Sequence, residues 1–95
     1  MKTQRPNIKS ALDELFEPHE ASNLKMRSKL MFHLITYIKE YDLTQDEAAK
    51  RFGVGQPRVS HLMNGKVDKF TIDALINMCN SAGLNVELHV DGAYA

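Results

Sequence analysis

The sequence predicts an all-α fold: a small bundle of helices with a helix-turn-helix at its centre and one β-strand at the C-terminal end. Three observations lead to this prediction. Apolar residues recur at helical spacing through most of the chain. Capping residues and glycines divide that pattern into short helices. The last apolar residues instead alternate with polar ones, which is typical of a strand. Ninety-five residues suit one domain with a modest core.

The chain divides into three predicted parts: residues 1–20 form an N-terminal arm and short helix, residues 21–83 the helix-turn-helix domain, and residues 84–95 a C-terminal strand and tail. The short helix carries apolar residues at helical spacing, Ala11, Leu12, Leu15 and Phe16, and stops at Pro18. Pro18 also suits the first turn of the next helix.

A long helix is predicted from Leu24 to Tyr41. Its apolar residues keep to one stripe with a period of 3.6: Leu24, Met31, Leu34, Ile35, Ile38 and Tyr41. The stripe is the face that we expect to pack against the remaining helices.

Local signals bound three shorter helices. Thr44 and Glu47 have the spacing of a capping box, and Gly53 suits the helix end. A second short helix follows, with Pro57 in its first turn and Gly65 beyond its end. The last helix begins after Thr71 and stops at Gly83, and Phe70 against Leu75 forms a hydrophobic staple at its start.

The first two of these helices fit a helix-turn-helix. Counted from Gln45 as position 1, the helices must cross closely at position 5, where Ala49 stands, and turn at position 9, where Gly53 stands. Five further positions must be buried, and all hold apolar residues: Ala48, Phe52, Val54, Val59 and Leu62. Because chance agreement at all seven positions is improbable, these residues strongly indicate a helix-turn-helix.

The outward face of the second helix is polar and carries no acidic residue, which suits entry into the major groove of DNA. The candidate DNA-binding residues are Gln45, Gln56, Pro57, Arg58, Ser60, His61, Asn64, Lys66 and Lys69. Gln56 is suited to adenine and Pro57 to a thymine methyl group. Arg58 suits a guanine or a phosphate equally, and Asn64 is either a phosphate contact or a helix C-cap.

The tail LNVELHV is the one convincing strand pattern in the chain. A lone strand leaves its backbone groups unpaired. We therefore expect residues 84–95 to act as a dimerisation element, with the same strand of a second copy as the symmetric partner.

The net charge is zero, but it is unevenly distributed. Residues 13–20 contain four acidic residues and no Lys or Arg, whereas residues 50–69 contain five Lys and Arg against one Asp. A neutral average thus hides a basic stretch of the kind that phosphate attraction requires. An ordinary solvated surface can have the same distribution of charge along the sequence.

Other classes of function find no support in the sequence. No apolar run approaches a membrane span or a signal peptide, so we expect a cytoplasmic protein without membrane contact. The four scattered histidines and Cys79 lack metal-ligand spacing, and we predict neither metal nor cofactor. No nucleophile–base pairing appears, and enzymatic activity is not expected.

Residues 43–66, LTQDEAAKRFGVGQPRVSHLMNGK, resemble the lambda-repressor-like (XRE) helix-turn-helix family. Together with the later apolar pattern and the tail, they are most similar to antitoxins of HigA type. The resemblance implies a dimeric autorepressor that binds a palindromic operator on double-stranded DNA, with a RelE/HigB-like toxin as partner. It also implies DNA contacts at Gln45, Gln56 and Asn64, with specificity at Arg58, Ser60 and His61.

Two departures from the family pattern stand out. Gly55 occupies the cap before the second short helix, where Ser or Thr is usual, and the fifth helix of lambda-type domains is replaced by the tail. The dimer is therefore either strand-mediated or helix-packed. The alternative function is a protein-interaction module that neutralises a toxin or scaffolds a partner without specific DNA binding.

Overall fold

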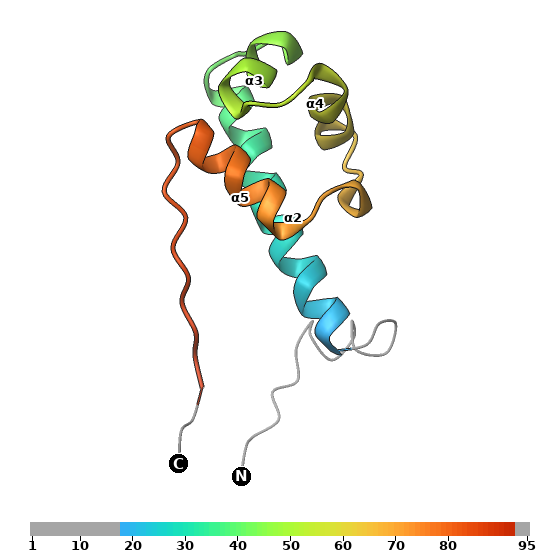
Figure 1. Cartoon of the computed structure of the whole chain (residues 1–95), viewed down its shortest axis with the longest axis vertical. Helices are drawn as coiled ribbons and strands as arrows, with labels where there is room; N and C mark the ends of the chain where they lie inside the picture. Colours follow the sequence, from blue (N-terminus) through green and yellow to red (C-terminus); the bar gives the residue numbers. More distant parts are fainter. Residues whose placement is uncertain (1–17, 93–95) are drawn as a thin grey trace.

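The computed structural model describes residues 18–92, and these form four α-helices and one short 3-10 helix. In chain order they are α2 (Pro18–Glu40), α3 (Gln45–Phe52), α4 (Gln56–Met63), η1 (Val67–Lys69) and α5 (Ile72–Ser81). The long helix α2 is the spine of the fold. Helices α3 and α4 lie at its C-terminal end, and α5 packs against its middle (Figure 1). The short helix predicted before Pro18 lies outside the described residues.

The long helix begins at Pro18, six residues earlier than the apolar stripe suggests, and proline opens it as a first-turn residue. Met31, Leu34 and Ile38 on the predicted stripe are buried. Tyr41 is 59% exposed instead, because the helix ends at Glu40 and the chain turns at Asp42, which has a φ of 53°. Neither α2 nor any other described helix is long and apolar enough to cross a membrane.

The core lies where α3, α4 and α5 meet α2. Phe52 of α3, Leu62 of α4 and Leu75 of α5 are almost completely buried, and they join Leu34 of α2 in one cluster. Burying side chains of this size contributes about 1.5–3 kcal/mol each. The three short helices are therefore held by packing against α2 rather than by their own helix propensity.

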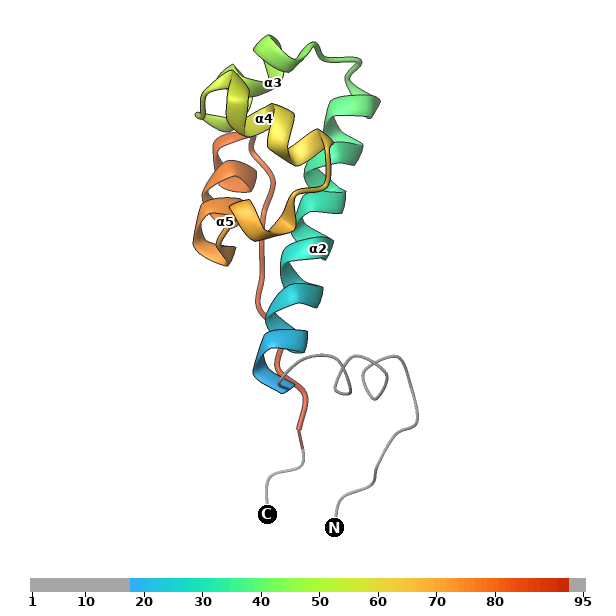
Figure 2. The same ribbon diagram turned by 90° about the vertical axis from the view of Figure 1, so that its right-hand side faces the viewer.

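The predicted C-terminal β-strand is wrong. Residues 84–92 are extended but belong to no sheet, and they run back from the end of α5 in the direction of the end at which α2 begins (Figures 1 and 2). After the amide of Leu84, which donates to the carbonyl of Cys79 at 2.9 Å, no backbone hydrogen bond pairs this segment with another described residue. A strand needs a partner strand, and residues 18–83 are helices and the turns between them.

The alternating pattern of the tail has another cause. Leu84 and Val86 pack against the core from one side of the extended chain. On the other side Asn85 donates a hydrogen bond to Glu87 at 2.9 Å. Extended backbone sends alternate side chains in opposite directions whether or not it is paired. The alternation thus reports an extended conformation and not a sheet.

Candidate nucleic-acid interface

The turn between α3 and α4 has the predicted geometry. Gly53 ends α3 in the left-handed conformation with a φ of 70°. The amide of Val54 donates to the carbonyl of Ala49 at 3.0 Å, and that of Gly53 to Lys50 at 3.4 Å. This pair of bonds is a Schellman motif, which closes the helix and redirects the chain. The turn sets the angle between the two helices.

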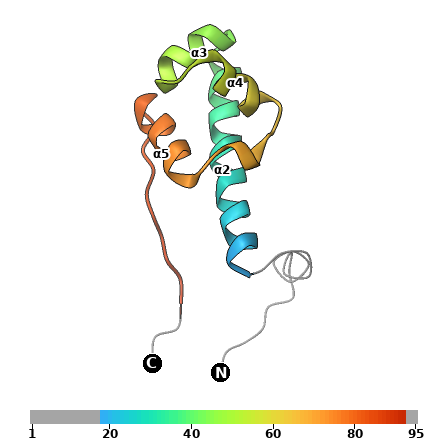
Figure 3. The ribbon, with the colours of Figure 1, turned by 45° about the vertical axis from the view of Figure 1, so that its right-hand side comes forward.

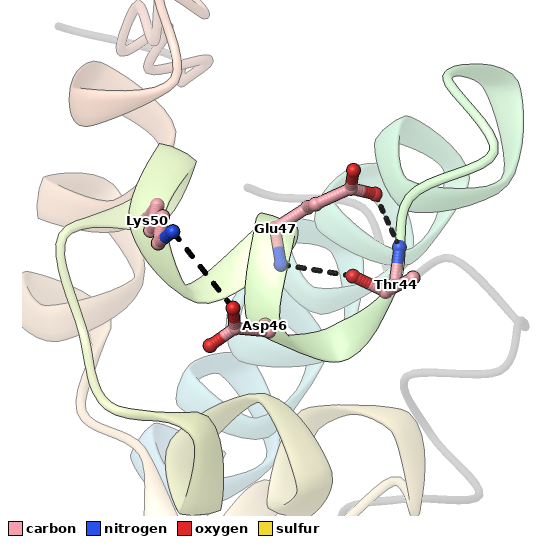
Figure 4. A network of polar contacts seen from close by, with 4 residues as sticks. All are labelled: Thr44, Asp46, Glu47 and Lys50. Carbon is pink, nitrogen blue, oxygen red and sulfur yellow. Dashed lines mark hydrogen bonds and ion pairs between the residues drawn. The ribbon is translucent and has the colours of Figure 1, made fainter.

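The start of α3 carries the predicted capping box (Figure 4). The hydroxyl of Thr44 accepts from the amide of Glu47 at 3.1 Å, and the Glu47 carboxylate accepts from the amide of Thr44 at 2.9 Å. Two amides at the helix start are satisfied in this way. Gln45, the first residue of α3, is thereby held at the surface at a fixed position.

The inner side of the helix-turn-helix is buried as predicted. Ala48, Phe52, Val59 and Leu62 are at most 2% exposed, and Val54 is partly buried against the same core. Because Val59 and Leu62 fix one side of α4 in the core, the opposite side must face outward. Figure 3 shows α3 and α4 together at one end of the long helix, away from the start of α2.

The outward side of α4 is polar. Gln56 and Pro57 at its start are exposed, Ser60 and His61 are half-buried, and Asn64 at its end is exposed. Helix α4 contains no acidic residue. Gly55 stands at the N-cap and offers no side-chain hydrogen bond. Polar donors and acceptors at the start of a projecting helix are what base edges in the major groove require.

Arg58 does not lie along this polar face. Its Nη1 donates to the carbonyl of Lys69 at 3.1 Å, and its guanidinium carbon lies 5.1 Å from the centre of the Phe70 ring. A cation over an aromatic face at this distance is attracted by the ring. The side chain is thus folded back on the segment after α4.

The segment after α4 contains the short helix η1, which the sequence did not predict. The amide of Lys66 donates to the carbonyl of His61, and that of Gly65 to Leu62, each at 3.0 Å, in a second Schellman motif. Asn64 is the C-cap residue of α4, so the cap role considered for it is present. The side chains of Lys66, which directly precedes η1, and of Lys69, its last residue, are exposed.

The other cations of the basic stretch have partners. Lys50 lies 3.9 Å from Asp46 across an exposed turn of α3 (Figure 4). Arg51 donates to the hydroxyl of Tyr37 at 2.8 Å and also lies over the ring of Tyr41. Within residues 18–92, Lys66 and Lys69 make no side-chain hydrogen bond or ion pair. These two lysines are the cations of the basic stretch that have no side-chain partner among the described residues.

Arg27 of α2 is a residue of this region that the sequence pattern did not single out. Its Nη1 donates to the carbonyls of Val67 at 3.0 Å and Phe70 at 3.4 Å. A signal was present, because Arg27 stands on the apolar stripe of α2, seven residues before Leu34. A charge on a buried stripe needs a partner. The carbonyls that Arg27 binds lie 40 and 43 residues later in the chain, so the sequence around Arg27 does not identify them.

Among residues 18–92, no group of three or more His, Cys, Asp or Glu side chains is arranged to hold a metal ion. Cys79 lies in the core, and burial raises the pKa of its thiol. A raised pKa lowers the fraction of reactive thiolate, so Cys79 acts as a small apolar core residue.

Two short helices around a left-handed glycine, a polar outward face free of acid and two exposed lysines define a DNA-binding helix-turn-helix protein. The family model described as "Helix-turn-helix domain" matches residues 11–91. A solved structure described as an XRE family transcriptional regulator is 30% identical, with a TM-score of 0.72. The match covers 78% of this chain and 83% of that one. No curated protein matches the chain.

The chain therefore belongs to the helix-turn-helix family of XRE type, a class of DNA-binding proteins that are not enzymes.

Proposed function

We propose that the chain is a transcriptional repressor that reads a palindromic operator near its own gene by inserting α4 into the major groove. The observation that carries this proposal is the orientation of α4. Val59 and Leu62 are completely buried, so the helix cannot rotate, and its acid-free polar side faces outward. A fixed helix that presents polar side chains from its first turn has the docking geometry of this motif.

The residues divide into two proposed roles. Gln56, Pro57, Ser60 and His61 read base edges, because they lie on α4 itself. The residues at the ends of the helices hold the phosphate backbone and set the register: Gln45, Asn64, Lys66 and Lys69. Of the two roles open to Arg58, its bond to Lys69 favours the phosphate side.

We propose that the protein acts as a homodimer in the cytoplasm. One α4 spans only a few base pairs, so useful specificity needs two copies spaced by one turn of DNA. Residues 84–95 remain our proposed dimerisation element. Leu88 is 82% exposed and Val90 63% exposed, and a second copy is the occupant that would remove both from water.

A binding titration tests the reading role. The chain is titrated onto duplex DNA from upstream of its own gene and onto a shuffled duplex of equal composition, at about 50 mM and about 200 mM salt. We expect tighter, salt-sensitive binding to the upstream duplex, ending at two chains per site. Replacing Gln56 by Ala should reduce the preference by about 1–3 kcal/mol, because one base contact is lost.

Ser22→Ala is the matched control, because Ser22 is exposed near the start of α2, at the other end of the spine from α4. This variant should bind as the unmodified chain does. Equal affinity for the two duplexes would contradict the proposal and favour the protein-interaction module instead.

We propose further that the protein is the antitoxin of a pair with a RelE/HigB-like toxin. The resemblance of residues 43–66, together with the later apolar pattern and the tail, to antitoxins of HigA type supports this role. The acidic residues between 13 and 20 support a docking stretch for a basic toxin, since opposite charges favour encounter and register.

The product of the adjacent gene, co-expressed with the chain, provides the test. Reversal of charge by Asp13→Lys with Glu17→Lys should abolish the co-purified complex while operator affinity is unchanged. A complex that survives the reversal, or operator binding that falls with it, would refute the separate toxin surface.

A further inference from the structure

The segment 65–70 after α4 is held from two sides by arginine side chains. Arg58 reaches it from α4, and Arg27 reaches it from α2. We infer that Arg27 is a positioning residue for DNA binding: it fixes the backbone that carries Lys66 and Lys69. This inference rests on the proposed function, since it assumes that these lysines grip the phosphate backbone.

The two guanidinium groups together engage three carbonyls. Nη1 of Arg27 donates to Val67 at 3.0 Å and to Phe70 at 3.4 Å, and Nη1 of Arg58 donates to Lys69 at 3.1 Å. The carbonyls bound by Arg27 stand on either side of Lys69 in the chain. Charged donors make stronger hydrogen bonds than neutral ones, and more so where water is partly excluded.

The segment needs such support, because η1 has little stability of its own. It is three residues long and has no side-chain cap at its start. A single 3-10 turn has few internal hydrogen bonds to hold it. Phe70 anchors its end in the core at 3% exposure, but Lys66 and Lys69 themselves are exposed. The arginines thus add side-chain contacts to the few backbone hydrogen bonds that hold the chain between α4 and Phe70.

Stability of the fold does not by itself account for an arginine at position 27. Arg27 is half-buried on the apolar stripe of α2, and its Nε is buried without a hydrogen-bond partner among the described residues. Leu24 and Met31 occupy the neighbouring turns of the same stripe. An apolar side chain would fill this place without the cost of an unpaired donor. What Arg27 provides in return is a fixed backbone conformation of segment 65–70, whose carbonyls it binds.

A fixed segment presents its two lysines in one arrangement before DNA arrives. Without Arg27 they must be ordered on binding, which lowers affinity without removing either charge. Arg27 should therefore matter to DNA binding only while Lys66 and Lys69 are present. That dependence distinguishes a positioning role from an effect of Arg27 on DNA binding that does not act through the two lysines.

A double-mutant cycle tests it. Arg27→Met keeps the apolar stem and removes the donors, and it is made both in the unmodified chain and in a Lys66→Ala/Lys69→Ala chain. In the unmodified chain we expect about three- to tenfold weaker operator binding with a nearly unchanged salt slope, since both lysines still meet phosphates in the complex and each such contact contributes about 0.9 to the slope. In the Lys66→Ala/Lys69→Ala chain we expect Arg27→Met to change operator affinity by less than about twofold.

Lys29→Met is the matched control. Lys29 is exposed on α2, and this change removes the same charge without touching segment 65–70. It should alter affinity by less than about twofold. Urea unfolding of each variant shows whether it is folded under the binding conditions. Hydrogen exchange at the amides of Lys69 and Phe70, measured without DNA, should be faster in Arg27→Met than in Lys29→Met.

The outcomes are distinguishable. If the unmodified chain does not prefer the operator, the proposed function fails. If it does, but Arg27→Met weakens binding equally in both backgrounds, or not at all, the positioning role is wrong. Unchanged hydrogen exchange at Lys69 and Phe70 overturns the inference regardless of DNA.

Discussion

At the scale of single residues, the helix-turn-helix depends on Gly53. The residue stands at a φ of 70°, where a side chain with a Cβ is strained by its own carbonyl. A Cβ at this position would also lie 3.0 Å from the hydroxyl oxygen of Ser81 on α5. The glycine thus allows both the turn after α3 and its close approach to the end of α5.

Gly53→Ala should destabilise the fold by about 1–2 kcal/mol, chiefly through the left-handed conformation. Gly65→Ala is the matched comparison, because Gly65 has a φ of 69° but no atom within 4 Å of the place that a Cβ would take. It should cost about 1 kcal/mol, from the backbone alone. Urea unfolding measures both variants. If Gly53→Ala is as stable as the unmodified chain, a Cβ at position 53 does not strain the turn and the claim is wrong.

Residue signals also explain why the candidate site was largely predictable. The capping box at Thr44, the turn at Gly53 and the burial of Val59 and Leu62 depend on spacings of a few residues, which the sequence displays directly. The folded-back position of Arg58 was not predictable in this way. Its partner Lys69 is eleven residues away, across a turn whose shape had to be known first.

At the scale of elements, the helices were predicted well and the tail was not. Helix ends are marked by local chemistry, so the ranges of α3, α4 and α5 follow from caps and glycines. Pairing in a sheet is a non-local property, and the alternation of Leu84 and Val86 could not report it. The tail packs these side chains on the core, and beyond the amide of Leu84 its backbone is unpaired within the described residues.

The same distinction applies to η1 and to Arg27. The 3-10 helix is too short to show a period, and its support comes from α2, forty residues earlier in the chain. Sequence patterns locate elements but do not reveal which distant side chain holds a loop. The structure adds that link between α2 and the segment that follows α4.

At the scale of the whole molecule, α2 separates two surfaces. The surface proposed to bind DNA, on α3 and α4, lies at its C-terminal end, and its other end begins at Pro18 (Figure 1). Twenty-three residues of helix span about 34 Å at 1.5 Å each. A partner held at the start of α2 would therefore leave α4 accessible, and changes on one surface should leave the other unaffected.

The most direct test of the central claim is a dimethyl sulfate protection experiment on the operator. The reagent modifies N7 of guanine in the major groove and N3 of adenine in the minor groove. If α4 reads the major groove in a dimer, guanines should be protected in two patches about one helical turn apart, and adenines should not be. Protection of adenines alone, or of neither base in a saturated complex, would contradict the account.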